Sequence, residues 1–501
     1  MSRGLITRRS VLITLVIFSV ISLGMQVYLL EWAGITSFSR FSSLHSADDG
    51  KHKHRRVISP FRATKLFANA AATFDVPVFL IEPECLENIS MYVALHKNNQ
   101  NYRNCNYLCG SRLVTSFGIL DASQISDGFL DHLGGMIDIK WTIFYGQDPR
   151  NATADHYKPP DIPLHYIFEY SGQFIHLVIF YERSNSYLWH GAVEDDPSSK
   201  RRPPRLPCIK DIELKRLRFG GVYAGAYNKM EFTITTADGV KIRIPKDLNN
   251  FLEQYPVSRY LECNHQRARE FKTTYGNDQS PEAEEFRQLA KDLLEKGKMV
   301  LDELGIVFWL SSGTCLGWFR ECDIIPHSKD VDFGIRIWDY KSNFIQEFDN
   351  GGLTLKHQFG KVSDSFELSF LHDYVKLDVF FFYEETDHMW NGGTEARSGN
   401  KFKYVFPKFT LCWAEILGLK VRVPCNTRQY IEANYGTEWN QKVTTWDWKS
   451  SPPNVRPNGQ WDRDEWPEVI QLPWFMLTGS MSRRNQSPLL LTMCPTLKQY
   501  H

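Results

Sequence analysis

We predict an α+β protein that consists of a membrane helix and two folded regions. Three features of the sequence lead to this prediction. An uncharged run of 20 residues near the N-terminus is long enough to cross a bilayer. Apolar runs of strand length then alternate with turns. A long stretch of helical periodicity follows, and it leads into two apolar strands that carry acidic residues.

Length and charge limit the possible functions. The chain has 501 residues, 43% of them hydrophobic, so it exceeds one ordinary domain and can build two cores. Lys plus Arg and Asp plus Glu each total 58, which gives a formal net charge of +0 at pH 7. Because no overall positive field would gather a polyanion, we do not expect nucleic-acid binding.

The beginning of the chain predicts a membrane anchor and a tether. The apolar run from Val11 to Leu30 follows several arginines, and its candidate cleavage site, Ser22-Leu-Gly24, lies inside the run. We therefore favour a retained signal anchor over a cleaved signal peptide. The positive-inside rule predicts type II topology, and the short span suits a thin Golgi or endoplasmic reticulum membrane. The cytoplasmic tail, the span and the lumenal stem are expected at residues 1–10, 11–30 and 31–60.

A lumenal location gives meaning to sequons and cysteines. Asn88 and Asn151 each begin an Asn-x-Ser/Thr sequon, and we expect both in glycosylated surface loops. An oxidising lumen permits disulfides among the ten cysteines, although the sequence does not reveal their pairing. Cys105 and Cys109 could be half of a zinc site, but no second pair with suitable spacing follows. A disulfide or two unlinked thiols is the preferred interpretation.

We predict an N-terminal lumenal domain over residues 61–279. Its clearest element is a β-hairpin formed by Leu164–Tyr170 and Phe174–Phe180 around a Ser-Gly-Gln turn. His165, His176 and His190 have no set of carboxylates nearby in the sequence, so we interpret them as ordinary histidines of a sheet. This region discloses no chemistry of its own, and support, oligomerisation or acceptor recognition all remain open as roles.

A second domain is predicted over residues 280–471. Ser280 can cap a helix whose first residue is Pro281, and apolar residues then recur at steps of three and four until Gly305. A buried strand, Ile306–Leu310, runs into a Gly/Ser turn and a short helix. Residues 472–501 show no clear periodicity, and we assign them no role.

Three acidic residues predict a metal site in this second domain. If Asp330-Val-Asp332 is extended, both acids share one face while Val331 faces the core. Asp378 lies in the apolar run Val375–Phe382, where an unpaired charge would be costly. A hard cation such as Mg²⁺ or Mn²⁺, shared by the three carboxylates, would remove that cost. The alternative is that the acids pair with Lys or Arg, or that Asp332 caps a turn.

The Gly/Ser turn upstream of the acids could bind phosphate. Ser312 and Gly313 stand between a strand and a helix, where backbone N–H groups and the helix N-terminus attract anions. This signal is weak alone. Together with the three acids it suggests an anion cradle beside a carboxylate metal clamp.

Several motifs resemble the LicD family of the nucleotidyltransferase superfamily. They include Gly313–Arg320, Ile325-Pro326 and Asp330–Gly334, and further downstream Phe406-Pro-Lys408 and Tyr430–Gly436. The likeness spans roughly residues 284 to 448, and it implies a nucleotidyltransferase-like catalytic domain with a mixed sheet. Members of this family handle nucleotide-activated phospho-alcohols.

A closer resemblance to one member of the family continues through Gln471. It includes Tyr187–Gly191 and Asp387–Gly393. It implies a Golgi type II enzyme that transfers ribitol 5-phosphate from CDP-ribitol to a GalNAc hydroxyl of the O-mannosyl core glycan on α-dystroglycan, with release of CMP. Assembly with other Golgi glycan-extending transferases is also possible on this view.

The resemblance assigns roles to individual residues. Asp330, Asp332 and Asp378 would be catalytic and would hold the metal, and Asp378, or a metal acting through it, would favour loss of the acceptor proton. The nucleotide and its phosphates would be contacted by Ser312, Gly313, Thr314 and Arg320, although a surface ion pair is an equally good interpretation of Arg320.

One position departs from the family pattern. Many relatives carry another Asp where this chain has Ser328, so the number of metal ions is open, and Lys329 could supply positive charge there. Trp446 and Trp448 are our only candidates for acceptor contact, although core packing is the commoner role of Trp. Two other functions compete with phosphoryl transfer: a glycosyltransferase that uses a nucleotide sugar at its Asp-x-Asp motif, and a non-catalytic, lectin-like scaffold for a partner transferase.

Overall fold

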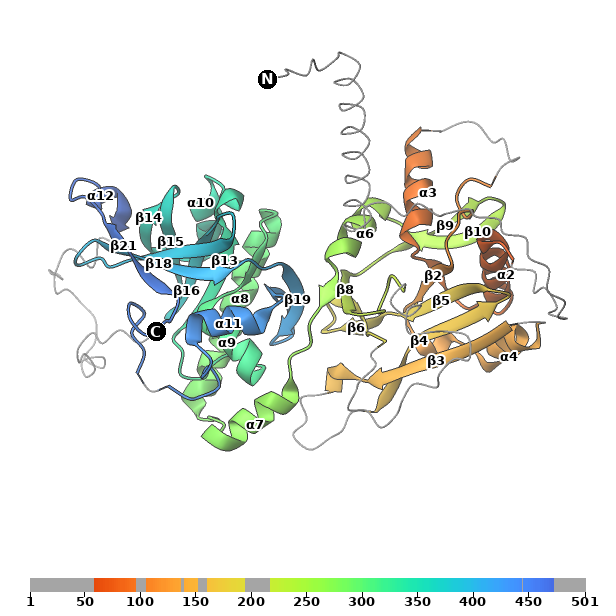
Figure 1. The fold of residues 1–501 in the computed structure, drawn as a ribbon, viewed down its shortest axis with the longest axis horizontal. Helices are drawn as coiled ribbons and strands as arrows, with labels where there is room; N and C mark the ends of the chain where they lie inside the picture. The colour runs from red at the N-terminus through yellow and green to blue at the C-terminus, as the bar shows by residue number, and fades with distance from the viewer. Residues whose placement is uncertain are drawn as a thin grey trace, which may run out of the picture. The chain divides into compact units, whose positions relative to one another are not determined.

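The structure is a computed structural model, and it describes residues 58–95, 105–136, 139–151, 160–193, 217–443 and 445–472. Runs of strands are interspersed with helices, and most strand pairs are antiparallel, so the predicted α+β class is confirmed (Figure 1). None of the described helices is long and apolar enough to span a bilayer. The anchor predicted at residues 11–30, the stem through residue 57 and the tail from residue 473 lie outside the described residues.

The N-terminal region is built around a five-stranded sheet of order β1-β2-β5-β4-β3. Its outer helix α2 begins at Pro60 because Ser59 accepts a hydrogen bond from the backbone of Arg62. The elements are α2 (Pro60–Thr73), β1 (Phe79–Leu80), α3 (Pro83–Leu95), β2 (Val114–Ile119), η1 (Ala122–Gln124), α4 (Asp127–Gly135), β3 (Ile139–Gln147), η2 (Pro149–Asn151), β4 (Asp161–Tyr170) and β5 (Gln173–Ile179).

The predicted hairpin is confirmed as β4 and β5. The two strands are antiparallel, with Tyr170 opposite Gln173. Ser171 and Gly172 form the turn with φ angles of 45° and 83°, the left-handed conformation that two-residue hairpins require. The prediction for Asn88 is wrong, because this residue lies within helix α3 and not in a loop. Pro83 sets the first turn of that helix, and no breaker interrupts it before Leu95.

A second sheet combines strands from both halves of the chain. Its order is β20-β19-β11-β8-β7-β6, and β11 is parallel to β19. The elements are β6 (Tyr181–Arg183), β7 (Tyr187–His190), β8 (Ala224–Asn228), β11 (Arg259–Tyr260), β19 (Leu411–Ile416) and β20 (Leu419–Pro424). Between β8 and β11 lie the hairpin β9 (Phe232–Ala237) and β10 (Val240–Pro245), helix α6 (Leu248–Gln254) and η3 (Tyr255–Val257). The domain boundary near residue 280 stays a prediction, and this sheet spans it.

Helices α7 (His265–Tyr275) and α8 (Pro281–Glu303) open the C-terminal region. As predicted, Ser280 caps α8 by accepting from the Ala283 N–H, and Gly305, with a φ of 66°, follows its end. Gly297 lets α8 pack closely on the sheet, because a Cβ there would lie 2.9 Å from Phe333 and 3.0 Å from Leu377. The apolar face of α8 thus covers the strands that carry the acids (Figure 1).

The C-terminal sheet is mixed. Strands β21-β18-β17-β16-β15-β14-β22 form a continuous order, and β13 pairs in parallel with β16 and antiparallel with β12. The elements are β12 (Phe308–Leu310), α9 (Ser312–Glu321), β13 (Asp330–Arg336), η4 (Ile337–Asp339), α10 (Phe344–Asn350), β14 (Thr354–Lys361), β15 (Asp364–His372), β16 (Val375–Glu384), β17 (His388–Thr394), β18 (Asn400–Pro407), α11 (Thr427–Tyr435), β21 (Val455–Gln460), α12 (Trp466–Val469) and β22 (Ile470–Gln471).

Three disulfides connect six of the described cysteines, whereas Cys85 and Cys315 are buried free thiols. Cys105 pairs with Cys109, so the zinc alternative for these residues is not needed. Cys263 pairs with Cys322 and ties the segment before α7 to the end of α9, while Cys412 pairs with Cys425. Pairing could not be deduced from spacing, because the partners in two of these bonds meet only after the chain folds.

Candidate active site

The three predicted acids come together at the junction of β13 and β16. The parallel register sets Asp332 opposite Asp378 and Asp330 opposite Lys376. Oxygen atoms of the three carboxylates all lie within 4.8 Å of one another, which is close enough for one cation to bind them. On the other face, Val331, Phe333 and Ile335 are fully buried, as their alternation predicts. A donor set made only of carboxylate oxygens fits Mg²⁺ or Mn²⁺.

Accessibility differs among the three acids. Asp378 is 0% exposed and Asp332 is 6% exposed, whereas the side chain of Asp330 is 12% exposed. Asp330 is therefore the acid that a substrate can reach most directly, and Asp378 lies deepest. The prediction that Asp378 could take a proton from the acceptor by direct contact has no support in this burial.

The N-terminus of α9 holds Asp332. Thr314 donates to Asp332 Oδ2 from its backbone N–H at 3.2 Å and from its hydroxyl at 3.3 Å, and the hydroxyl accepts from the Asp332 N–H at 2.8 Å. The sequence interpretation of Ser312 and Gly313 as a turn was wrong, since both belong to the first turn of α9. Ser312 has a positive φ of 38°, a strained conformation for a residue with a side chain.

Gly313 keeps space open next to Asp332. A Cβ on this glycine would lie 3.5 Å from Asp332 Oδ2 and 4.0 Å from the Tyr435 hydroxyl. Burial, together with the nearby charge of Asp332, raises the pKa of Tyr435, so its hydroxyl stays protonated and able to donate. The Trp446 ring lies 5.0 Å from that of Tyr435, which places Trp446 near this edge of the site.

Trp448 lies elsewhere on the sheet. Its ring contacts Phe402, and its carbonyl accepts from the Tyr404 hydroxyl at 2.9 Å. The two tryptophans predicted as acceptor contacts thus occupy different surroundings, and only Trp446 is linked to the acids through Tyr435.

Arg320 is engaged by groups other than the acids. It donates to Glu321 Oε1 at 2.5 Å and 3.0 Å, and it lies over the Phe271 ring at 4.2 Å. It is 5% exposed, so the ion-pair alternative describes its contacts, but the pair is buried and not at the surface. The predicted phosphate contact stays a prediction without a supporting contact.

Lys376 is the residue that sequence reasoning missed. Its Nζ lies 2.6 Å from Asp378 Oδ2 and 3.4 Å from Asp330 Oδ2. Burial opposes its charge, yet Asp378 and Asp330 together raise the pKa of Lys376 above its ordinary value. The signal was present, because Lys376 stands two residues before Asp378 and must share its face of the strand. The alternative that the acids pair with a basic residue is therefore confirmed for Asp330 and Asp378.

A row of polar side chains extends from the acids across the sheet. The register continues from Asp378 to Ser369 on β15 and from Ser369 to His357 on β14. The Ser369 hydroxyl donates to Asp378 Oδ1 and lies 2.5 Å from His357 Nε2, and Glu367 Oε1 is 4.0 Å from that nitrogen. His357, Glu367 and Asp378 also have ligand atoms within 4.8 Å of one another.

Ser328 closes the row at the other side. Its hydroxyl donates to Asp330 Oδ1 at 2.9 Å. The family resemblance predicts an Asp at position 328. Ser328 instead donates a hydrogen bond, which occupies one lone pair of Asp330.

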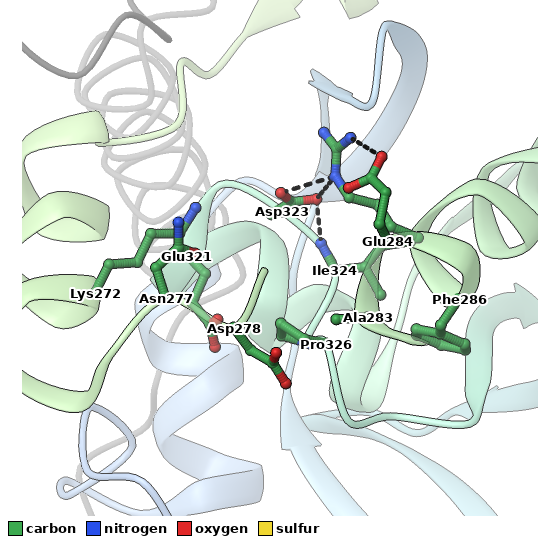
Figure 2. A pocket seen from close by; sticks show the side chains of 11 residues that line it. Lys272, Asn277, Asp278, Ala283, Glu284, Phe286, Glu321, Asp323, Ile324 and Pro326 are labelled. Carbon is green, nitrogen blue, oxygen red and sulfur yellow. Dashed lines mark hydrogen bonds and ion pairs between the residues drawn. The ribbon is translucent and has the colours of Figure 1, made fainter. Parts of the chain in front are cut away.

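A separate pocket lies beside α7, α8 and the segment after α9 (Figure 2). Arg287 Nε donates to both oxygens of Asp323 at 3.0 Å inside it. Its lining includes Lys272, Asn277 and Glu321 but none of the three acids. We assign it no part in the chemistry.

Two family models match the chain, one in each half. A family model described as "Fukutin N-terminal" matches residues 1–291, and one described as "LicD/FKTN/FKRP, nucleotidyltransferase domain" matches residues 305–426. The human protein named "Ribitol-5-phosphate transferase FKTN" is 47% identical over 437 residues, covering 86% of this chain and 93% of its own. The mouse protein of that name is 46% identical with the same coverage.

More distant matches add less. An uncharacterised Caenorhabditis elegans protein is 28% identical over 244 residues, covering 46% of this chain and 61% of its own. The solved structure of the Megavirus polyadenylate synthase covers 70% of this chain and 68% of its own, at 10% identity and a TM-score of 0.20.

Proposed function

The chain belongs to the fukutin family, and we propose that it is a ribitol-5-phosphate transferase that uses CDP-ribitol as its donor. The observation that carries this proposal is the convergence of Asp330, Asp332 and Asp378 within 4.8 Å, on strands of the matched nucleotidyltransferase region. The acceptor we propose is a GalNAc hydroxyl of the O-mannosyl core glycan on α-dystroglycan.

In the proposed reaction the acceptor oxygen attacks the phosphorus that carries ribitol. The bond from this phosphorus to the CMP oxygen breaks, CMP leaves, and the acceptor hydroxyl loses its proton. Such a transfer needs positioning and charge neutralisation more than covalent help from the protein. A divalent cation held by the three acids would neutralise the charge of the diphosphate.

The side chains have distinct parts in this proposal. In this proposal Asp330, the acid with the most exposed side chain, accepts the proton of the acceptor hydroxyl. Asp332 is held in one orientation by Thr314, and Asp378 anchors Lys376, whose ammonium adds positive charge beside the phosphates. Gly313 leaves room for the nucleotide next to Asp332.

The enzyme would act from a Golgi membrane with its catalytic domain in the lumen. The apolar run of residues 11–30 and the arginines before it support a type II anchor. The three disulfides fit an oxidising compartment. Protease protection of the C-terminal region in intact Golgi vesicles would test this orientation, and digestion without detergent would refute it.

The function is tested by transfer from defined donors. Purified protein is incubated with a phospho-glycopeptide acceptor and either CDP-ribitol or a panel of UDP and GDP sugars, with and without EDTA. We expect CMP release and a mass increase of one ribitol phosphate only with CDP-ribitol and free divalent cation. Incorporation of a hexose would identify the glycosyltransferase alternative instead.

Asp330→Asn tests the role of the acids. The substitution removes one negative charge at the metal site, so we expect transfer to fall at least ~1,000-fold while the unfolding transition is retained. Asp364→Asn, in strand β15 of the same sheet and paired with Lys401, is the matched control. Full glycan extension by the Asp330→Asn protein would favour the scaffold alternative.

A further inference from the structure

The position of Lys376 follows from strand register and not from a choice of rotamer. Lys376 lies directly opposite Asp330 in the parallel pair, and Asp378, two residues on, lies opposite Asp332. Residues two apart in a strand share a face. The lysine and the three acids therefore occupy one small patch of the sheet, whichever rotamer the lysine adopts.

The ammonium of Lys376 already bridges two of the acids. It lies 2.6 Å from Asp378 Oδ2 and 3.4 Å from Asp330 Oδ2, and its side chain is 18% exposed. An alkyl ammonium is charged at neutral pH. A positive charge thus lies against one oxygen of Asp330 and one oxygen of Asp378.

The remaining oxygens favour one further cation. Ser369 donates to Asp378 Oδ1, and Ser328 donates to Asp330 Oδ1. Neither serine adds negative charge to the site. The formal charge of the three acids is balanced by one lysine and one divalent cation together. The next carboxylate along the row, Glu367, is matched in charge by Lys356, which interacts with Asp330 and Asp378, so a second divalent cation would leave the site with excess positive charge.

We propose that Lys376 takes the place of a second cation, so that the site binds a single divalent ion and Lys376 serves as the other positive group facing the donor's diphosphate. This inference rests on the proposed function, because it concerns the same site. It makes Lys376 a catalytic residue by contact with a diphosphate, and it predicts how many metal ions the protein binds.

The test counts bound Mn²⁺ directly. The purified full chain is stripped of metal and titrated with Mn²⁺ alone, and free Mn²⁺ is measured by its electron paramagnetic resonance signal. We expect one equivalent for the wild type and for Lys376→Arg, which keeps the charge. We expect two equivalents, with a spin-coupled spectrum, for Lys376→Met combined with Ser328→Asp, which exchanges the ammonium for an additional carboxylate beside Asp330.

Controls separate charge from folding. Lys401→Met removes a partly buried lysine from a 2.7 Å ion pair with Asp364 in the same sheet, and it should still bind one equivalent. Lys376→Gln, a polar replacement, provides a second test with Ser328→Asp if the methionine variant does not fold. Circular dichroism and the unfolding midpoint establish folding for each protein.

The outcomes distinguish this inference from the proposed function. If the wild type binds two equivalents of Mn²⁺, the inference is overturned and metal-assisted transfer is left intact. If Lys376→Met and Lys376→Gln, each folded and combined with Ser328→Asp, bind only one equivalent of Mn²⁺, the inference is also overturned. Wild-type protein that binds no Mn²⁺, or Asp332→Asn protein that binds as much as the wild type, overturns the metal site itself and the inference with it.

Discussion

At the residue scale, the site is a line of polar groups on neighbouring strands. Asp332, Asp378, Ser369 and His357 are successive partners across β13, β16, β15 and β14. Each buried polar group requires a partner, and this row supplies partners through short cross-strand contacts. The orientation of Asp378 therefore depends on Ser369 and His357, which do not need to touch the substrate.

Ser369→Ala tests this positioning. Without the hydroxyl, Asp378 Oδ1 loses its donor and the carboxylate can turn away, so we expect the affinity for Mn²⁺ to fall about 10- to 100-fold. Ser369→Thr keeps the hydroxyl, so this variant should retain most of the wild-type affinity for Mn²⁺. Ser365→Ala is the control, since Ser365 is a buried serine of the same strand that donates to Asp364 at 2.8 Å. Unchanged Mn²⁺ affinity in Ser369→Ala would show that the hydroxyl does not position Asp378.

The three histidines of the N-terminal region form one buried cluster. His176 Nε2 donates to His165 Nδ1 at 3.0 Å, and His165 Nε2 and His190 Nδ1 each donate to the Gly191 carbonyl at 3.0 Å. This assignment follows from the network, because a carbonyl only accepts. His176 Nδ1 is then buried without a partner, so a proton there would find no acceptor.

This cluster predicts a loss of stability in acid. Burial, and the neighbouring His190, lower the pKa of His176 to about 3, and burial lowers that of His190 to about 4. The unfolded chain binds more protons than the folded chain from about pH 6.5 downward, so stability is complete above this pH and decreases as pH falls. At pH 5, His176 and His190 each lower the free energy of unfolding by about 2 kcal/mol relative to its value at neutral pH.

His176→Gln provides the measurement. The amide can still donate to His165 but does not titrate, so the decrease in unfolding free energy between pH 7.5 and pH 5 should shrink by about 2 kcal/mol. Urea unfolding at both pH values measures this difference. His132→Gln, at an exposed position of α4, should leave it as in the wild type. An equal pH dependence in His176→Gln and the wild type would contradict the prediction.

At the scale of elements, helix α8 fixes the two acidic strands from behind. Its Gly297 faces Phe333 and Leu377, and these residues directly follow Asp332 and precede Asp378. The caps and the periodicity of α8 were predictable because they depend on nearby residues. The contact at Gly297 was not, because its partners lie on strands that meet only through long-range pairing.

Gly297→Val should therefore affect both stability and activity. The added carbons would overlap the Phe333 ring and the Leu377 side chain, and we expect the free energy of unfolding to fall by about 2 kcal/mol. Transfer should also slow, because movement of these side chains shifts the acids. Met299→Val, at a position that is 50% exposed on the same helix, should cost only about 0.4 kcal/mol. A Gly297→Val protein with wild-type stability would show that α8 is not tightly seated.

At the scale of the whole molecule, the second sheet couples the two predicted domains. Strand β11 pairs with β19, Tyr187 donates to Glu415 at 2.7 Å, and Lys420 donates to Asn228 at 2.7 Å. The disulfide between Cys263 and Cys322 adds a covalent link between the segment before α7 and the end of α9. The turn before α8 marks a change in the sequence pattern near residue 280. The strand pair, the hydrogen bonds and the disulfide all connect residues before this turn with residues after it.

A fragment of residues 277–472 tests this coupling. It lacks β11 and Cys263, so β19 becomes an open edge and Glu415 loses its partner Tyr187. Exposed strand edges promote association, and we expect the fragment to aggregate or to be digested rapidly by protease. Residues 58–472 should elute as one species and unfold in one transition. A stable, monodisperse fragment would show that the catalytic region folds independently.

The sequence by itself determined the class of the protein, the cap and course of α8, the β4–β5 hairpin and the three acids. These features depend on local periodicity, caps and turn residues, which act over a few positions. Only the tertiary structure decided that Lys376, Ser369 and His357 join the acids, that Arg320 is occupied by Glu321, and which cysteines pair. These contacts depend on strand register between distant segments, and the hydrophobic packing of the whole chain sets that register.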